Sequence, residues 1–450
     1  MGELPLLLNF NLNTVYDSYL SKMTSENSVY RKITWRLLPV LFLCYILAYL
    51  DRVNVGFAKL AMKEELWFSD AVFALGSGIF FIGYFLFEVP ANLIMHRVGA
   101  RLWITRIMIT WGLCSALCAL STDAVHFYFF RFLLGMAEAG FFPGVILYLT
   151  YWYPEHYRAR MVASFMSAVA LAGIIGSPVS GWLLESSQSW NSLKPWQWLF
   201  LLEGIPSVLV GLLVPFLLAD GPAKVKWLSA DEKQIVADDL KAAEELRSST
   251  GLKAGTLRDA FRSPWLWLCC LVYFSFIFSL YGISFWLPQL LEEKISRDKL
   301  IIGLVAAIPW LCASVGMILF GRHSDRTGER RWHISIMAWA GMVAFLLAGL
   351  PAVPGWIFIV MISLAATSSL SSISTFWSLP SAILSGTAAA AGIAWINSVG
   401  NLAGYLSPEL FLWMKEHFHL GAGLMAVGVL LGLGGLLTFF LWPSRRAVSR

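Results

Sequence analysis

The feature that most constrains the fold is a series of apolar stretches, each long enough to cross a lipid bilayer. A membrane-spanning helix needs about 20 predominantly apolar residues, because the hydrocarbon core is about 30 Å thick. The chain contains twelve such stretches, and only 14% of its 450 residues are charged, whereas about 25% is usual in a globular protein. We therefore expect an all-α integral membrane protein with twelve transmembrane helices, at 34–57, 71–95, 102–120, 125–147, 161–184, 197–219, 265–291, 301–321, 333–351, 355–377, 381–408 and 421–442.

A polar segment separates the first six stretches from the last six. Sixteen of the 44 residues in this segment are charged, and Ser229 with Glu232 has the spacing of a capping box, which predicts a surface helix to about Arg247. Met23 directly precedes a polar, basic segment, so we hypothesise that it is the natural start and that 1–22 are a misassigned extension. The expected organisation is a tail over 1–33, a six-helix bundle over 34–219, a central loop over 220–263, a six-helix bundle over 264–442 and a tail over 443–450.

The distribution of Lys and Arg predicts the orientation, because short loops rich in these residues stay in the cytoplasm. If both termini are cytoplasmic, the inner tails and loops hold 23 of the 33 Lys and Arg residues. Three more, Arg52, Arg106 and Arg131, are embedded in apolar stretches. The inner excess accounts for the net charge of +5 without a nucleic-acid partner. The outer loops hold the other seven, which are Lys59, Lys63, Lys194, Lys294, Arg297, Lys299 and Lys415.

Several classes of function are disfavoured by what the sequence lacks. No Gly-x-x-x-x-Gly-Lys-Ser/Thr loop is present, so ATP is not expected as the energy source, and no enzymatic activity is predicted. The six cysteines all fall in predicted helices without the spacing of a ligand set, so we expect neither a metal nor a disulfide.

Two loops repeat one pattern in the two halves of the chain. Arg97-Val98-Gly99-Ala100-Arg101 follows the second apolar stretch, and Arg326-Thr327-Gly328-Glu329-Arg330 follows the eighth, 229 residues later. The second copy, with Gly321 and Asp325 before it, resembles the signature loop of the major facilitator superfamily. The first copy departs from that signature at Asn92 and His96. The resemblance implies two pseudo-symmetric six-helix bundles and a conformational loop motif made of Arg97, Gly99, Arg101, Gly321, Asp325, Arg326 and Gly328.

Three further stretches, at 49–56, 84–92 and 131–144, resemble the anion:cation symporters of that superfamily. The resemblance implies a carrier that imports a small organic anion, such as a sugar acid or tartrate, with protons by alternating access. It would work as a monomer in the bacterial inner membrane, driven by the proton gradient without a cofactor. An aromatic-acid symporter is the main alternative. An organic-anion exchanger, a proton-driven drug exporter and a non-transporting sensor are weaker ones, since the embedded arginines disfavour cationic drugs and the seventh helix lacks an arginine.

Asp51 and Arg52 lie side by side within the first apolar stretch, although each embedded charge costs about 2.5–3.5 kcal/mol on insertion scales. At about 100° per residue they occupy adjacent stripes, so Arg52 is expected to face a central cavity and Asp51 its own half. Arg131 and Glu138 lie seven residues apart on one face of the fourth stretch. No Asp, Glu, Lys or Arg occurs in 265–291, 301–321, 333–408 or 420–442.

A guanidinium group can grip a carboxylate with two parallel hydrogen bonds, so Arg52 and Arg131 are the expected anion ligands. Desolvation favours the protonated form of a carboxylic acid and a nearby arginine favours the ionised form, so substrate binding at an arginine could trigger protonation. Asp51 and Glu138 are therefore the expected proton carriers. The alternative is that Asp51 merely neutralises Arg52 or Arg131.

The predictions for the other polar residues of the apolar stretches are less specific. Glu88 is expected to pack or bond between helices, whereas Arg106 and Glu203 are expected to reach the membrane interface. The further residues expected to contact substrate are Tyr49, Tyr84, Trp377 and Asn397.

Overall fold

The computed structural model describes residues 12–65, 67–190, 192–249, 262–377, 379–380 and 386–441, and these contain helices and connections without strands. Eleven of the described helical segments are long and apolar enough to cross a membrane. The described part of the remaining predicted stretch, 381–408, falls on two helices that meet at Leu402. The all-α membrane fold is therefore confirmed. The predicted tail 443–450 and residues 1–11 of the other tail lie outside the described residues.

The helices form an N-terminal and a C-terminal group. The first contains α1 (Leu12–Val53), α2 (Val55–Met62), α3 (Asp70–Val98), α4 (Ala100–Leu117), α5 (Ala124–Glu138), α6 (Phe141–Thr150), α7 (Glu155–Met166), α8 (Ala168–Ser186) and α9 (Pro195–Leu217). The second contains α12 (Pro264–Lys294), α13 (Lys299–Thr327), α14 (Arg331–Ala348), α15 (Gly355–Phe376), α17 (Gly386–Asn401), α18 (Ala403–His417) and α19 (Leu420–Leu437).

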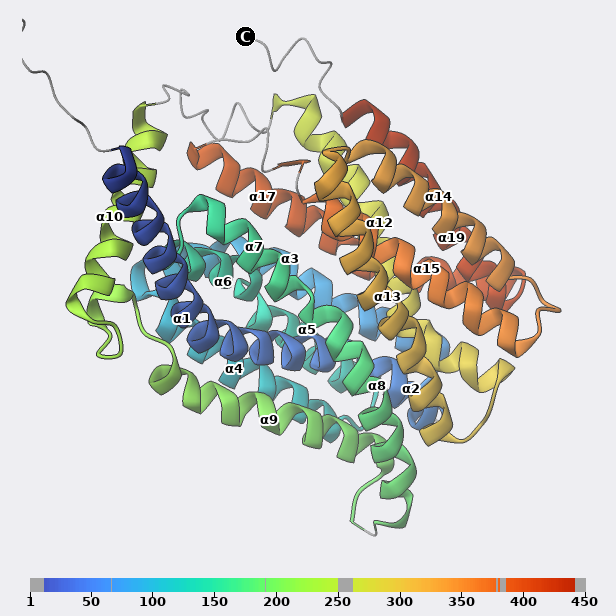
Figure 1. The fold of residues 1–450 in the computed structure, drawn as a ribbon. Helices are drawn as coiled ribbons and strands as arrows, with labels where there is room; N and C mark the ends of the chain where they lie inside the picture. Colours follow the sequence, from blue (N-terminus) through green and yellow to red (C-terminus); the bar gives the residue numbers. More distant parts are fainter. Residues whose placement is uncertain are drawn as a thin grey trace, which may run out of the picture.

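Both ends of the described chain lie on one face of the molecule, at the top of Figure 1, while the connection between α8 and α9 lies at the bottom. We call these the terminal face and the distal face. The predicted loop helix is present as α10 (Ala230–Ser249) on the terminal side. Its capping box is formed, since the Ser229 N–H donates to Glu232 at 2.8 Å and the Glu232 N–H donates to Ser229 Oγ at 3.1 Å.

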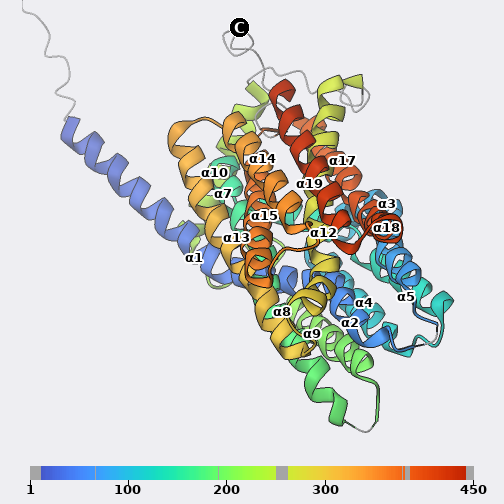
Figure 2. The same ribbon diagram turned by 90° about the vertical axis from the view of Figure 1, so that its right-hand side faces the viewer.

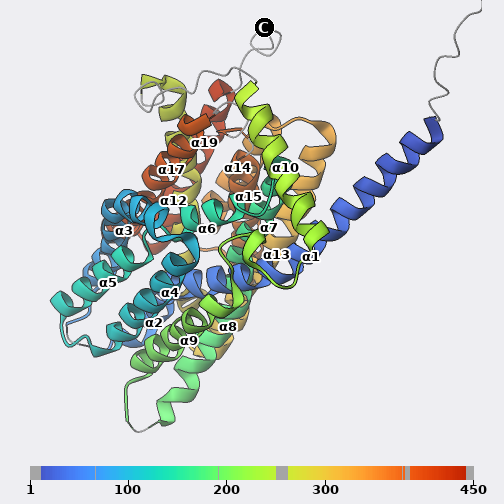
Figure 3. The same ribbon diagram turned by 90° about the vertical axis from the view of Figure 1, so that its left-hand side faces the viewer.

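Side-chain contacts tie α10 to the beginning of the first membrane helix. Lys32 Nζ lies 2.8 Å from Glu232, and the Tyr30 hydroxyl donates to Asp239 at 2.9 Å. Figure 3 shows α10 running beside α1. The first turns of α1 project beyond the two bundles, as Figure 2 shows. The position of the natural start codon stays a prediction.

Three further apolar stretches predicted as single helices are also each built from two helices. The first breaks at Asn54, the fourth at Ala139 and Gly140, and the fifth at Ser167. Gly140 has φ of 86°, a left-handed conformation that glycine adopts without a steric penalty. The first break comes two residues after Arg52 and the second directly after Glu138, so each of these embedded charged residues lies at the end of a helix.

The predicted loop position of Lys59 is wrong. The helical chain continues to Met62, and Lys59 is buried. Its ammonium group lies 2.7 Å from Asp70 Oδ1 and faces the rings of Phe73 and Trp286, at 4.1 and 3.9 Å from their centroids. A carboxylate and two aromatic faces together offset the cost of removing this cation from water.

The two groups of helices meet along α8 with α13, α3 with α18, and α2 with α12. Near the distal face, two glycines allow the backbones of α8 and α13 to touch. A Cβ atom on Gly181 would lie 2.4 Å from Lys299 O, and one on Gly303 would lie 2.4 Å from Ser177 O. Ion pairs join the groups at the same level, between Lys63 and Glu292 (2.7 Å) and between Lys415 and Asp70. The distal ends of the two halves are therefore in contact.

Replacing Gly303 with Val should force the distal ends apart, because the added side chain would overlap the backbone of α8. Double electron–electron resonance spectroscopy would detect this separation as a longer distance between spin labels attached at Gln188→Cys and Arg297→Cys in a cysteine-free background. Leu304→Ala is the matched control, since the neighbouring Leu304 is 53% exposed. Equal label distances in Gly303→Val and the control would contradict the importance of this contact.

Candidate functional site

A cavity lies between the two groups of helices at mid-height. Its N-terminal wall is rich in aromatic rings and contains one ion pair, and its C-terminal wall contains aromatic, aliphatic and amide side chains. A largely apolar cavity with few polar groups is the usual form of a small-molecule site. The lining includes Tyr45, Tyr49, Arg52, Tyr84, Glu138, Phe141 and Phe142 on the N-terminal side, with Tyr273, Tyr281, Ile373, Ser374, Asn397 and Asn401 opposite.

Arg52 is the charged centre of this cavity. It is only 7% exposed and forms an ion pair with Glu138 of α5. Its Nη1 donates to the Tyr281 hydroxyl at 2.6 Å, across the boundary between the two halves. The guanidinium also lies over the rings of Phe80 and Tyr84, at 5.3 and 5.5 Å from their centroids. The Arg52 Nε has no hydrogen-bond acceptor, so the guanidinium keeps donor capacity beyond its present partners.

The hydrogen bonds continue from Tyr281 around the C-terminal wall. The Tyr281 hydroxyl donates to Asn401 Oδ1 at 3.2 Å, and Asn401 Nδ2 donates to the Asn397 carbonyl at 2.9 Å. Asn397 Nδ2 then donates to Glu88 Oε1 of α3 at 3.0 Å, and Ser398 donates to the other Glu88 oxygen. The network therefore leaves the N-terminal half at Arg52 and returns to it at Glu88. The halves cannot separate here without breaking both connections.

Asp51 points away from the cavity and into its own half. It is fully buried and accepts hydrogen bonds from Trp111 Nε1 (3.0 Å), Ser115 (2.6 Å) and Ser207 (2.7 Å). Within the described part of the chain it forms no ion pair. The neutralising role considered for Asp51 thus falls to Glu138, which is the acid paired with Arg52.

Arg131 also lies outside the cavity lining. It is completely buried, and its Nε donates to the Gly76 carbonyl at 3.1 Å while its Nη2 donates to the Arg52 carbonyl at 3.4 Å. These contacts brace the backbones of α3 and α1 behind the Arg52 side chain. Of the two arginines expected to bind an anion, Arg52 is therefore the one at the cavity.

The remaining residues expected at the site fall into two groups. Tyr49, Tyr84 and Asn397 line the cavity. Trp377 lies at its edge on the terminal side, with its ring 4.8 Å from that of Tyr273 and 6.5 Å from that of Phe142 in the other half.

Of the two residues predicted to reach the membrane interface, Glu203 is buried instead, because the surrounding helices offer it a partner, whereas the interfacial position of Arg106 stays a prediction. Glu203 is 4% exposed, since α9 begins at Pro195 and places it two turns inside, where Ser180 donates to its Oε1 at 2.6 Å. Arg106 is half-buried, with its guanidinium 4.0 Å from the Trp103 ring centroid and 3.2 Å from the Ala137 carbonyl.

The repeated loops lie on the terminal side, away from the cavity. Gly99 and Gly328 have φ of 94° and 66°, so both turns use the backbone freedom of glycine. Gly321 lies within α13, and Arg97 and Arg326 are exposed. The remaining motif residues form ion pairs, Arg101 with Asp220 at 4.0 Å and Asp325 with Arg330 at 2.6 Å.

Comparison with known proteins agrees with this architecture. The sequence matches the Major Facilitator Superfamily over residues 41–408. It is 47% identical over 383 residues to the protein named metabolite transport protein NicT of Pseudomonas putida, covering 85% of this chain and 87% of that one. It is 44% identical over 421 residues to a protein of Agrobacterium vitis that carries the name tartrate transporter, covering 92% and 95%. The inward-open xylose transporter XylE from E. coli has a similar fold, with a TM-score of 0.71 at 16% identity, covering 91% and 96%.

Removing one partner of the buried ion pair should destabilise the protein. Arg52→Met should lower the free energy of unfolding by about 3–5 kcal/mol, because Glu138 would remain as an unpaired buried charge. Adding Glu138→Leu should recover part of that loss. Thermal unfolding of the purified single and double variants in detergent would measure both effects. A double variant less stable than Arg52→Met would show that the two residues do not act as a pair.

Proposed function

The chain belongs to the major facilitator superfamily, and from this premise we propose that it imports a small organic anion together with protons. The membrane is the bacterial inner membrane, with the terminal face in the cytoplasm, as the Lys and Arg distribution predicts. Transport uses alternating access, in which the two halves rock around a central site. The protein acts as a monomer in the lipid bilayer and uses the proton gradient without a cofactor.

The observation that carries this proposal is the ion pair of Arg52 with Glu138 at the cavity wall. A substrate carboxylate competes with Glu138 for the guanidinium, since both offer the same planar pair of oxygens. The Tyr281 hydroxyl, 2.6 Å from Arg52, links the bound anion to the C-terminal half.

Coupling to protons follows from the same exchange. When the substrate takes Arg52, Glu138 loses the cation that stabilises its ionised form, and a buried carboxylate without a partner is costly. Proton uptake removes that cost, so the anion and a proton load together. Asp51 is the second proton carrier, held by three neutral donors one residue from Arg52.

A hydroxylated acid of the tartrate or sugar-acid kind is the leading substrate class. The hydroxyl and amide groups of Tyr49, Tyr84, Asn397 and Asn401 would bond its hydroxyls, and a relative 44% identical to this chain carries the name tartrate transporter. An aromatic acid is the second candidate, because seven rings of Tyr and Phe line the cavity. A thermal-shift series with tartrate, galactonate and hydroxyphenylacetate would rank these acids, since binding to the folded state raises its stability.

Substrate uptake by proteoliposomes should acidify their interior. Glu138→Gln should abolish accumulation driven by a pH gradient while leaving exchange of internal for external substrate. A pH-sensitive dye and labelled tartrate would measure the two processes, with the surface variant Glu64→Gln as the matched control. If the rate of uptake by the unmodified protein did not depend on the imposed pH gradient, proton symport would be excluded. Substrate binding without any uptake would indicate a sensor.

Arg52→Lys should weaken substrate binding by about tenfold or more, because an ammonium cannot make the two parallel hydrogen bonds of a guanidinium. Isothermal titration with the best acid of the thermal-shift series would measure the affinity. Arg106→Lys, an arginine on α4 outside the cavity lining, is the matched control. An unchanged affinity in Arg52→Lys would mean that Arg52 serves only the structure.

A further inference from the structure

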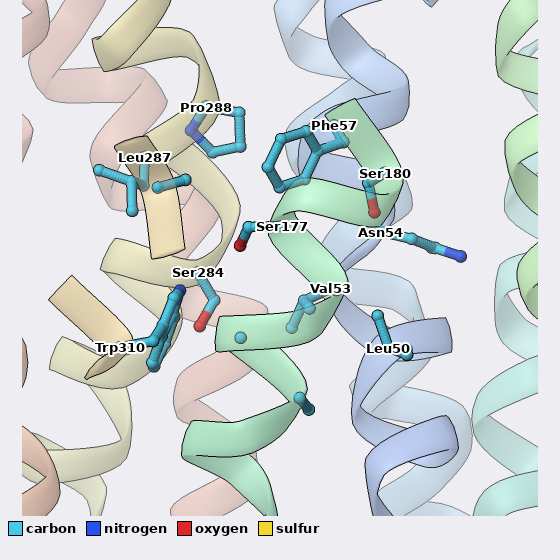
Figure 4. A pocket seen from close by; sticks show the side chains of 14 residues that line it. Leu50, Val53, Asn54, Phe57, Ser177, Ser180, Ser284, Leu287, Pro288 and Trp310 are labelled. Atoms are coloured by element: carbon cyan, nitrogen blue, oxygen red, sulfur yellow. The ribbon is translucent and has the colours of Figure 1, made fainter. Parts of the chain in front are cut away.

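A second, smaller pocket lies on the distal side of the central cavity, between α1, α2 and α8 of one half and α12 and α13 of the other. Figure 4 shows its lining, which includes Asn54, Ser177 and Ser180 from the N-terminal half and Ser284 and Trp310 from the C-terminal half. Tyr49 stands between this pocket and the central cavity, with its hydroxyl 3.1 Å from Ser284 Oγ. The pocket therefore lies between the cavity and the distal face.

Asn54 of this pocket has no hydrogen-bond partner for either end of its amide, although it is only 1% exposed. Its side chain points away from Ser284 and Trp310 and toward the interior of the N-terminal half, as Figure 4 shows. A buried amide without partners is destabilising, because its donor and acceptor lose their hydrogen bonds to water without replacement. Such a group indicates a missing donor, acceptor or water molecule.

Glu203 is the nearby group that can supply what Asn54 lacks. Its Oε1 accepts the hydrogen bond of Ser180, another residue of the pocket wall, and its Oε2 has no donor. The Asn54 amide lies within reach of the Glu203 carboxyl group, although the two are not aligned for a full hydrogen bond. Asn54 Nδ2 can donate to either form of Glu203, whereas only a proton on Oε2 would give Asn54 Oδ1 a donor, directly or through one water molecule.

The surroundings of Glu203 contain no compensating cation within the described part of the chain. The elements α1, α2, α4 and α8 pack against α9, as do the short turns Cys118–Leu120 and Ser187–Ser189. Among the charged groups on these elements, Asp51 is the one that interacts electrostatically with Glu203, and it is also an acid. An ionised Glu203 would therefore be a buried negative charge facing another, which is strongly unfavourable.

We propose that Glu203 is a third proton-binding carboxyl group, which passes protons between the pocket at Asn54 and Asp51. In each transfer one proton leaves Glu203 Oε2 and binds the ionised Asp51 carboxylate. Glu203 is then left as the carboxylate, and a proton from the distal pocket restores its acid form. Ser207, one turn from Glu203 on the same face of α9, donates to Asp51 at 2.7 Å and so holds the Asp51 carboxylate against that face of α9.

This proposal rests on proton symport, but the proton on Glu203 can be tested without transport. Infrared spectroscopy of the purified protein at neutral pH should show a C=O band of protonated carboxyl groups. Glu203→Gln should remove one carboxyl's share of that band. Glu292→Gln is the control and should leave it unchanged, because Glu292 forms ion pairs with Lys63 and Lys299 at 2.7 and 2.6 Å. An unchanged band in Glu203→Gln would overturn the proposal.

The relay itself is tested in proteoliposomes. Gln keeps the acceptor for Ser180 and offers Asn54 a donor, so Glu203→Gln should fold normally and retain substrate exchange within twofold. It should slow uptake driven by a pH gradient at least tenfold. Ser180→Ala, which keeps the acid, should retain gradient-driven uptake. The relay would be overturned if Glu203→Gln took up substrate under a pH gradient as fast as the unmodified protein. If uptake by the unmodified protein did not depend on the gradient, symport itself would be overturned. The infrared band would still report whether Glu203 carries a proton.

Discussion

The ion pair of Arg52 with Glu138 is the interaction on which the centre of the molecule depends. Two charges so deeply buried are tolerated only if they pair with each other and if neighbouring dipoles satisfy their remaining hydrogen-bonding groups. The Tyr281 hydroxyl and the faces of Phe80 and Tyr84 do this for the guanidinium. The pair is thus stable by itself, and in the proposed function a substrate carboxylate competes for the same guanidinium. One contact would then serve both the stability of the fold and the binding of the anion.

The two halves differ in the charges that they bury. Among the described residues, the buried charged side chains belong to the N-terminal half, and the C-terminal wall of the cavity contributes hydroxyl and amide groups. At the cavity the halves are therefore joined by hydrogen bonds such as Arg52 to Tyr281 and Asn397 to Glu88. Ion pairs between the halves occur at the distal ends, where water can solvate the separated charges. Relative movement of the halves consequently breaks no ion pair at the cavity, although it removes the two C-terminal hydrogen-bond donors of Glu88.

Much of the fold follows from the sequence because membrane helices are set by local composition. Stretch length located most of the membrane helices to within a few residues but did not predict the breaks within four of the stretches. The stripes of one helix predicted that Arg52 and Asp51 point in different directions. Contacts between distant segments were not predictable in this way. The burial of Lys59 depends on Trp286 of the other half, the position of Glu203 depends on Ser180, and the lining of the cavity by Arg52 but not Arg131 depends on how α5 packs against α3. Periodicity along one helix contains no information on these pairings.

Under the proposed mechanism, the positions of Asp51 and Glu138 imply that the two acids respond to substrate by different routes. Glu138 touches Arg52 and loses its partner as soon as an anion binds there. Asp51 has no contact with the cavity, and its link to the substrate is the backbone it shares with Arg52, just before the helix break at Asn54. Arg131 holds that same backbone through the Arg52 carbonyl. A shift of Arg52 toward a substrate therefore pulls on the segment that carries Asp51 and alters its three hydrogen bonds. The break at Asn54 separates this segment from α2, so the segment can move without dragging α2 with it.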